Sequence, residues 1–396
     1  MMSNKPPVWI GVGLAFYAFI AIAIAEGGLG VLLPSILTTY HLTTATVTAL
    51  FFSQISGYVV AALTSSLLSQ RIGLARMILL AAISLTTALC IYAATPHWLV
   101  MVITGTLLGL GIGLIDAGIN TFIAHKQDSA HLMGVLHAFY GVGALTGPAI
   151  ATLLLTTGVS WRSVYWVFAA MVGLLVIGMI WVIAQPYPLI DSSAIPAEQS
   201  AGKNLRLALK TPTVRVAGLL LLVYVGTEAS LGNWAYTVQT VSRGTPVALA
   251  GYSVAAYWFG LTLGRLTMGQ LMKRLGAARL IDGSLALLTV GLLIWWWFPQ
   301  QLWSLPIIGF ALAAIFPTTM WLMPRRVPAA LVPAAIGFAA SIGSIGAVGI
   351  PTIVGWLADQ TNLEVVPIFM VPLALVMVML HRWLVDHTQT PSPEEV

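Results

Sequence analysis

A basic motif occurs twice in the chain. It reads QRIGLAR at residues 70–76 and KRLGAAR at residues 273–279, about 203 positions later. Other matches follow in the same order at nearly the same offset. These pairs are Gly134 and Gly337, Gly143 and Gly346, Pro148 and Pro351, and Glu26 and Glu228. Because the matches fall in one order in both halves, the sequence predicts an internal repeat that runs in the same direction.

The composition excludes a soluble globular domain. Of the 396 residues, 59% are hydrophobic and 7% are charged, whereas a soluble domain carries about 25% charged residues. So few charges cannot cover a water-facing surface, which makes lipid the solvent for most of the chain. The same balance excludes disordered and collagen-like chains. The single cysteine, Cys90, excludes a disulfide scaffold.

Long apolar stretches predict twelve membrane-spanning helices, each of which needs about 20 residues. We therefore expect an all-α membrane protein whose twelve transmembrane helices form two pseudo-symmetric six-helix bundles. A polar stretch separates the halves, which places the bundles at residues 1–185 and 212–387, a cytoplasmic linker at 186–211 and a disordered tail at 388–396. The predicted spans start near Val8, Ala45, Leu74, Trp98, Leu132, Ser163, Thr213, Ala248, Leu280, Leu302, Ala330 and Val365.

The basic residues predict the orientation in the membrane. Nearly all loop arginines and lysines fall on one side, and only Arg162 and Arg243 fall clearly on the other. Because cytoplasmic loops carry an excess of basic residues, we expect both termini and the linker in the cytoplasm, with the loops near Pro96 and Pro299 outside. The net charge of +5 reflects this bias, so nucleic acid is not an expected partner. We expect a monomeric, multi-pass protein of the cell inner (plasma) membrane.

Three carboxylates lie deep within predicted spans, on Glu26, Asp116 and Glu228. A charge at the bilayer centre costs about 2.5–3.5 kcal/mol, so each carboxylate is a candidate functional group. The alternative is a buried ion pair. Arg265 is the one basic residue clearly within a predicted span, however, and one arginine cannot neutralise three carboxylates. A buried carboxylate that binds a proton from one side and releases it to the other performs the chemistry of proton-coupled transport. We assign this role to Glu26 and Asp116.

Polar side chains near these carboxylates are candidates for binding a solute. A same-direction repeat predicts a substrate site between the two bundles near the membrane midplane. Asn120 follows Asp116 by four residues and therefore shares its helical face. His137 lies in the fifth span. For Asn120 and His137, a hydrogen bond between helices is an equal alternative.

The seventh span is the richest in polar and aromatic side chains. Aromatic rings beside amide and carboxyl groups suit a sugar, which presents apolar ring faces and a rim of hydroxyls. Interfacial anchoring is the alternative for Trp234. No cluster in the sequence predicts a metal site or a catalytic residue. The predicted substrate-binding residues are Glu26, Asn120, His137, Glu228, Asn233, Trp234, Tyr236 and Gln239.

The twelve spans, the linker and the repeated basic loop resemble the major facilitator superfamily over essentially the whole chain. This resemblance implies a transporter rather than an enzyme, with Arg71 and Arg274 gating its cytoplasmic side. Glu26 on the first span and Asp116 on the fourth are similar to the carboxylates of the fucose–galactose–glucose proton symporters. That finer likeness implies proton-coupled symport of a sugar or sugar-like polar solute by alternating access. The proton gradient is the energy source, and no cofactor is expected.

Two other functions remain open. Gly134, Gly143, Gly147 and Pro148 resemble the fifth-span motif of superfamily antiporters, which favours a proton-driven drug or metabolite exporter. A membrane-bound transferase would need a metal site, an activated nucleophile or a large domain outside the membrane. The sequence indicates none of these.

Overall fold

The computed structural model describes residues 8–124, 126, 129–185, 190 and 201–387, and every regular element in these ranges is helical. The tail at 388–396 and much of the expected linker lie outside the described residues. Part of that linker, however, forms helix α8. The α-helices are α1 (Val8–Gly27), α2 (Leu29–Thr39), α3 (Ala49–Ile72), α4 (Leu74–Ala94), α5 (Trp98–Ala124), α6 (Ser129–Thr156), α7 (Trp161–Ile183), α8 (Ala201–Lys210), α9 (Pro212–Thr237), α10 (Val247–Leu275), α11 (Ala277–Trp297), α12 (Ser304–Leu312), α13 (Ile315–Arg326), α14 (Val332–Gln360) and α15 (Val365–Asp386).

The prediction of twelve spans is confirmed. Among the described residues, twelve helical segments are long and apolar enough to cross a membrane, and each begins within three residues of its predicted start. Helices suit this solvent because lipid offers no partners to backbone amides and carbonyls, so each span must satisfy them internally. Three spans contain two α-helices or end in another helix type: α1 with α2, α12 with α13, and α9 with the π-helix η2 (Val238–Ser242).

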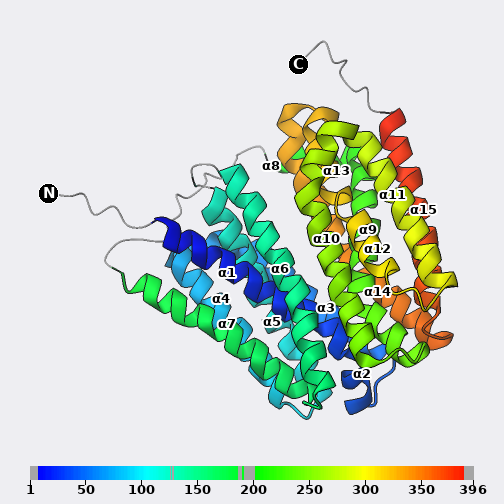
Figure 1. Cartoon of the computed structure of the whole chain (residues 1–396). Coiled ribbons are helices and arrows are strands. Elements are labelled where there is room, and N and C mark those ends of the chain that lie inside the picture. Colours follow the sequence, from blue (N-terminus) through cyan, green and yellow to red (C-terminus); the bar gives the residue numbers. More distant parts are fainter. Residues whose placement is uncertain (1–7, 125, 127–128, 186–189, 191–200, 388–396) are drawn as a thin grey trace. The chain divides into compact units, whose positions relative to one another are not determined.

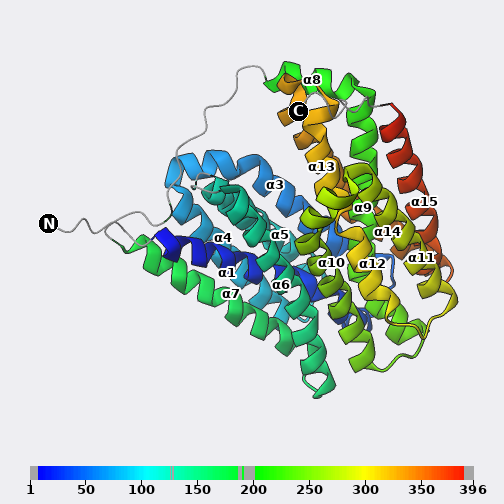
Figure 2. The same cartoon turned by 45° about the horizontal axis from the view of Figure 1, so that its top comes forward.

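The chain divides into two compact units, Met1–Ile195 and Pro196–Val396. Figures 1 and 2 show that each unit is a bundle of helices. In the first unit, α1 packs on α6 and α7, α3 packs on α5, and α4 packs on α5 and α7. The second unit repeats this scheme: α9 packs on α14 and α15, α10 on α12, and α11 on α12 and α15. The internal repeat in the sequence therefore corresponds to a repeated packing scheme.

Glycines allow the closest helix contacts in both units. A Cβ atom on Gly57 of α3 would overlap the Thr106 carbonyl oxygen of α5. Its counterpart at the repeat offset, Gly260 of α10, would overlap the Pro306 carbonyl oxygen of α12. The predicted small-residue stripe on α5 is also confirmed, because a Cβ atom on Gly109 would overlap the backbone of α3. Only glycine permits such an approach without displacing a backbone.

The repeated basic motif forms the same turn in both units. Gly73 has φ +86° and Gly276 has φ +81°, and each lies directly between two helices. Their amides donate to the carbonyls of Ser69 and Met272, both at 2.9 Å, which ends the preceding helix. A positive φ is accessible to glycine at little steric cost. This geometry explains why both copies of the motif contain glycine at the same place.

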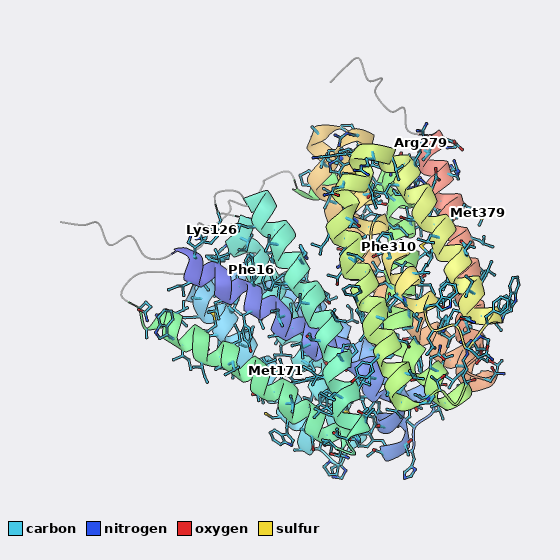
Figure 3. All side chains as sticks on the ribbon, in the orientation of Figure 1. Phe16, Lys126, Met171, Arg279, Phe310 and Met379 are labelled. Atoms are coloured by element: carbon cyan, nitrogen blue, oxygen red, sulfur yellow. The ribbon has the colours of Figure 1, made fainter. Side chains whose placement is uncertain are left out.

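Large apolar side chains cover the outside of the helices. Leu63 on α3 is 74% exposed, and Met379 on α15 is 63% exposed and points away from its bundle (Figure 3). In water such a surface would be unfavourable. In a bilayer it is the surface that contacts the acyl chains, which agrees with the membrane class predicted from composition.

Candidate functional site

The Asp116 carboxylate lies on α5 and accepts hydrogen bonds on both oxygens. Tyr58 of α3 donates its hydroxyl to Oδ2 at 2.6 Å, and the Asn120 amide donates to Oδ1 at 2.8 Å. Asn120 also donates to the Asp116 backbone oxygen at 2.9 Å, so the predicted shared helical face is confirmed. Both donors to the carboxylate are electrically neutral. The arrangement therefore solvates Asp116 without a counter-charge from either one.

The Glu26 carboxylate lies near the end of α1. Tyr140 of α6 donates its hydroxyl to Oε2 at 2.8 Å. Two glycines hold α6 close to α1: a Cβ on Gly143 would overlap the Ile20 carbonyl, and one on Gly147 would lie 2.8 Å from the Ile24 carbonyl. Close packing of the two backbones thus brings Tyr140 within reach of Glu26. The donor is again a neutral hydroxyl.

The Glu228 carboxylate on α9 has different partners. Arg265 of α10 lies 3.6 Å from Oε1, and the Tyr224 hydroxyl donates to Oε2. The Tyr257 hydroxyl of α10 donates to the Glu228 backbone oxygen at 3.2 Å. The side chains of Glu228 and Arg265 retain 17% and 27% of their exposure. The ion pair considered from the sequence therefore exists for Glu228, although this glutamate is the repeat counterpart of Glu26.

The remaining candidates on the seventh span are mostly buried. Trp234 has no exposed surface and donates its indole N–H to the Pro351 carbonyl of α14 at 3.0 Å. Gln239 is also fully buried, and its Oε1 accepts from Thr245 at 3.1 Å. Tyr236 is 3% exposed, whereas Asn233 is partly exposed. Among these four side chains, Asn233 is the most accessible to a solute in this structure.

His137 and the two motif arginines lie at exposed positions. The His137 ring meets the Phe19 ring edge-on, with centroids 5.7 Å apart, so α6 presents it beside α1. Arg71 is the second-to-last residue of α3, and Arg274 is the second-to-last residue of α10. Both arginine side chains are exposed, which leaves them available for contacts that form in another conformation.

Three tyrosines that contact the carboxylates were not among the predicted site residues. Tyr58, Tyr140 and Tyr224 each donate a hydroxyl to one of the three intramembrane carboxylates. A signal existed for Tyr224, which precedes Glu228 by four residues on the same helical face. None existed for Tyr58, because its pairing with Asp116 joins two helices through residues that are 58 positions apart in sequence.

The three carboxylates can therefore do different chemistry. A hydroxyl both donates and accepts, so Tyr58 can donate to an ionised Asp116 and accept from a protonated one after rotation of its O–H bond. An amide N–H can only donate, so Asn120 keeps Oδ1 as an acceptor. A proton on Asp116 is thus best accommodated on Oδ2. Glu228 differs from both, because its carboxylate lies beside the positively charged Arg265 side chain.

Comparison with known proteins agrees with this architecture. The sequence profile of the Major Facilitator Superfamily matches residues 15–307 and 234–396. Over 401 residues the chain is 25% identical to Bypass of stop codon protein 6 of Saccharomyces cerevisiae, with 92% of this chain and 80% of that protein covered. Over 359 residues it is 23% identical to the Glucose/mannose transporter GlcP of Bacillus subtilis, with 89% and 88% covered.

Solved structures show the same fold. The structure of the nucleoside transporter NupG superposes with a TM-score of 0.78 at 15% identity, covering 95% of this chain and 99% of that one. The D-xylose-proton symporter superposes with a TM-score of 0.77 at 13% identity, covering 98% and 99%. The profile match extends over far more than half of the sequence, and the twelve spans form two units with one packing scheme. The chain is therefore a multi-pass membrane transporter, not an enzyme, and it belongs to the Major Facilitator Superfamily.

Proposed function

We propose that this transporter is a symporter that moves a sugar or sugar-like polar solute together with protons by alternating access. The proton gradient drives transport, and no cofactor takes part. The observation that carries the proposal is the Asp116 centre, in which a membrane-embedded carboxylate has two neutral donors and a hydroxyl able to serve both protonation states. Such a centre can bind and release a proton without breaking an ion pair.

Glu26 is the second proton-coupling candidate, because it too accepts a hydrogen bond from a neutral hydroxyl, that of Tyr140. The two carboxylates are expected to lie close enough to bias each other's protonation, as coupled sites do. Glu228 is assigned to solute binding, because it lies on the seventh span with Asn233, Tyr236 and Gln239. With Asn120, His137, Asn233, Trp234, Tyr236 and Gln239, these side chains form the proposed solute-binding set.

The sugar assignment rests on two kinds of support. One is the Bacillus relative, which is named a glucose and mannose transporter. The other is the mixture of rings, amides and carboxylates among the candidates, because a sugar offers apolar faces and a hydroxyl rim. The first probes are therefore D-glucose and D-mannose.

Export receives no separate support from the structure of the fifth span. The glycines that resemble the antiporter motif, Gly143 and Gly147, pack against the backbone of α1. Helix contact accounts for both of them, so we do not propose export as a second function.

The test is uptake by proteoliposomes that carry the purified protein and an imposed pH gradient. The wild type should accumulate D-glucose or D-mannose uphill. Asp116→Asn imitates the protonated state, so it should exchange solute across the membrane but lose uphill accumulation. Glu26→Gln should either behave in the same way or lose binding, depending on which carboxylate contacts the solute. Uphill accumulation by Asp116→Asn in response to the gradient would contradict the assignment of the coupling site.

Orientation is the remaining part of the proposal. We place the protein in the inner (plasma) membrane of the cell as a monomer. Both termini and the linker then lie in the cytoplasm. Thiol labels on Pro96→Cys and Pro299→Cys should react from outside intact cells, and a label on Ser200→Cys should react only after permeabilisation. External labelling at the linker would reverse the orientation.

A further inference from the structure

Arg162 and Arg243, which stand apart from the other basic loop residues in the sequence, each lie at or beside a loop that follows an odd-numbered span. Three loops follow the odd-numbered spans of each unit, and we call them the odd loops. In the first unit they are residues 40–45, 95–97 and 157–160. In the second they are residues 243–246, 298–303 and 361–364. Arg162 is the second residue of α7, which follows the third loop of the first set, and Arg243 opens the first loop of the second set.

Arg162 connects the odd loops of the first unit. Its Nη2 donates to the Thr95 carbonyl at 3.0 Å and to the Tyr40 hydroxyl at 3.4 Å. The Tyr40 hydroxyl itself donates to the Thr95 carbonyl at 2.8 Å. The Arg162 guanidinium lies over the ring of Trp161, 4.5 Å from its centroid, and that indole donates to Thr39 at 2.9 Å. One side chain at the start of α7 thus joins the first two odd loops to the helix that follows the third.

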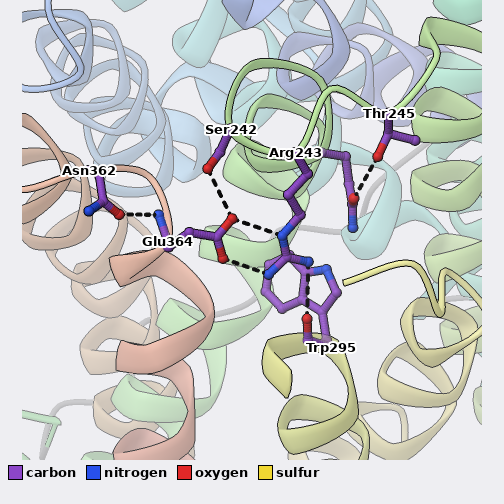
Figure 4. A network of polar contacts seen from close by, with 7 residues as sticks. Ser242, Arg243, Thr245, Trp295, Asn362 and Glu364 are labelled. Carbon is purple, nitrogen blue, oxygen red and sulfur yellow. Dashed lines mark hydrogen bonds and ion pairs between the residues drawn. The ribbon is translucent and has the colours of Figure 1, made fainter. Parts of the chain in front are cut away.

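Arg243 connects the first and third odd loops of the second unit to the end of α11, as Figure 4 shows. Its Nε and Nη2 donate to the two oxygens of Glu364 at 2.9 and 2.8 Å, and its Nη1 donates to the Trp295 carbonyl at 3.0 Å. The Ser242 hydroxyl donates a further hydrogen bond to Oε1 of Glu364 at 2.9 Å. The Glu364 backbone amide donates to the side-chain oxygen of Asn362, also at 2.9 Å. Arg243 therefore reaches the end of α11 and the loop before α15.

Burial and charge distinguish these contacts from an ordinary surface ion pair. The Arg243 side chain is 6% exposed, and its planar guanidinium donates hydrogen bonds from three N–H groups at once. Hydrogen bonds from Arg243 lower the pKa of Glu364, although burial opposes them, so this pair is ionised at neutral pH. In the first unit, burial raises the pKa of the Tyr40 hydroxyl and keeps it a donor, although Arg162 acts in the opposite direction.

We propose that Arg162 and Arg243 are positioning residues for the transport cycle. Each connects helix ends and odd loops of its own unit to one another, so that these helix ends move together when the transporter changes state. This proposal rests on alternating access in the proposed function, because only a mechanism that moves whole bundles requires such a connection. The arginines act through the helices and need no contact with the solute.

Distances inside one unit provide a test that needs no solute. In a Cys90→Ala background, spin labels are placed on Gln300→Cys and Gln360→Cys in the second unit. A separate protein carries labels on His97→Cys and Thr156→Cys in the first. Pulsed electron paramagnetic resonance in lipid nanodiscs then measures each distance distribution. All four labelling positions lie in or beside odd loops and are at least partly exposed.

Each arginine variant should affect its own unit. Arg243→Ala and Glu364→Gln should each broaden the second-unit distribution about twofold and leave the first unchanged, because they remove the same charge-assisted bonds. Arg162→Ala should do the reverse. Arg279→Ala, an exposed arginine in the basic motif, should change neither. Unchanged widths in the mutated unit would overturn the proposal.

Two further measurements keep the test decisive. If Arg243→Ala does not fold, Arg243→Lys takes its place. Lysine retains the positive charge but lacks the planar guanidinium, so this variant should broaden the second-unit distance distribution to a smaller degree. In proteoliposomes, Arg243→Ala should lower the maximal rate of D-glucose uptake about fivefold with little change in KM, because the substitution slows the change of state and removes no bond to the solute. Failure of the wild type to transport D-glucose would contradict the proposed solute, whereas the distance measurements would still decide the role of the arginines.

Discussion

The hydroxyl of Tyr58 offers the most direct test of proton coupling. Tyr58→Phe removes one oxygen atom and leaves the ring, so it eliminates the 2.6 Å hydrogen bond to Asp116 Oδ2 and keeps the packing of α3 against α5. The variant should still transport, because Asn120 continues to bind the other carboxylate oxygen. What should change is the pH at which proton-driven uptake is half-maximal.

The size of the change follows from the two states of the carboxylate. A hydrogen bond to an ionised group contributes about 1.5–3 kcal/mol, and one between neutral groups contributes about 0.5–1.5 kcal/mol. Loss of the hydroxyl therefore penalises the ionised state more than the protonated state, by about 1–1.5 kcal/mol. Because 1.36 kcal/mol corresponds to roughly one pH unit, the midpoint of uptake should move about one unit to higher pH.

The assay is the initial rate of gradient-driven D-glucose uptake across a series of external pH values. Tyr17→Phe is the matched control, because Tyr17 also donates a 2.6 Å hydrogen bond in the first unit, but to the Met171 carbonyl rather than to a carboxylate. It should lower thermal stability without moving the midpoint. A Tyr58→Phe midpoint within about 0.3 units of the wild type would refute the assignment of Asp116 as a proton site.

Three further predictions concern the gate, the packing and the loop ion pair. Arg71→Ala and Arg274→Ala should each slow D-glucose uptake with little loss of equilibrium binding, since a gate changes state populations; equal losses in rate and affinity would indicate contact with the solute. In thermal unfolding, Gly109→Ala should cost about 1–3 kcal/mol because its Cβ overlaps the α3 backbone. Gly134→Ala, where a Cβ meets open space, should cost little. Hydrogen bonds from Arg243 lower the pKa of Glu364 in the folded protein. The Arg243–Glu364 pair therefore stabilises the fold above the ordinary pKa of a glutamate, and this stabilisation is lost as the pH falls through the lowered pKa. Melting curves between about pH 5 and 3 should show that loss in the wild type and less of it in Glu364→Gln.

Most of the fold was predictable because its signals are local or periodic. Twenty-residue apolar stretches, the turn glycines at positions 73 and 276 and the repeat offset are all visible in one sequence, and each corresponds to a feature of the structure. Helix α8 was not predicted. It lies in a polar segment, where hydropathy gives no indication of a helix, and it packs against α9 and α14.

The site was less predictable than the fold. The cost of a buried charge selects Glu26, Asp116 and Glu228 from the sequence, but it says nothing about what each carboxylate contacts. Glu26 and Glu228 are repeat counterparts, yet one accepts a bond from a hydroxyl of another helix and the other faces an arginine. Trp234 shows a second limit, since neither its aromatic ring nor its position indicates that its N–H binds a backbone carbonyl of α14. Such contacts depend on the packing of segments far apart in sequence.

The neutral donors around Asp116 have a consequence for the electrical behaviour of the transporter. When its proton is bound this centre has no net charge, and when the proton is released it has a charge of −1. A membrane potential therefore acts on the empty carrier more than on the loaded one, with up to about 2.3 kcal/mol per 100 mV for a charge that crosses the whole field. A potential that is negative inside would drive the deprotonated centre outward. Voltage should accordingly accelerate the return of the empty transporter, and currents recorded with Asp116→Asn should lack that dependence.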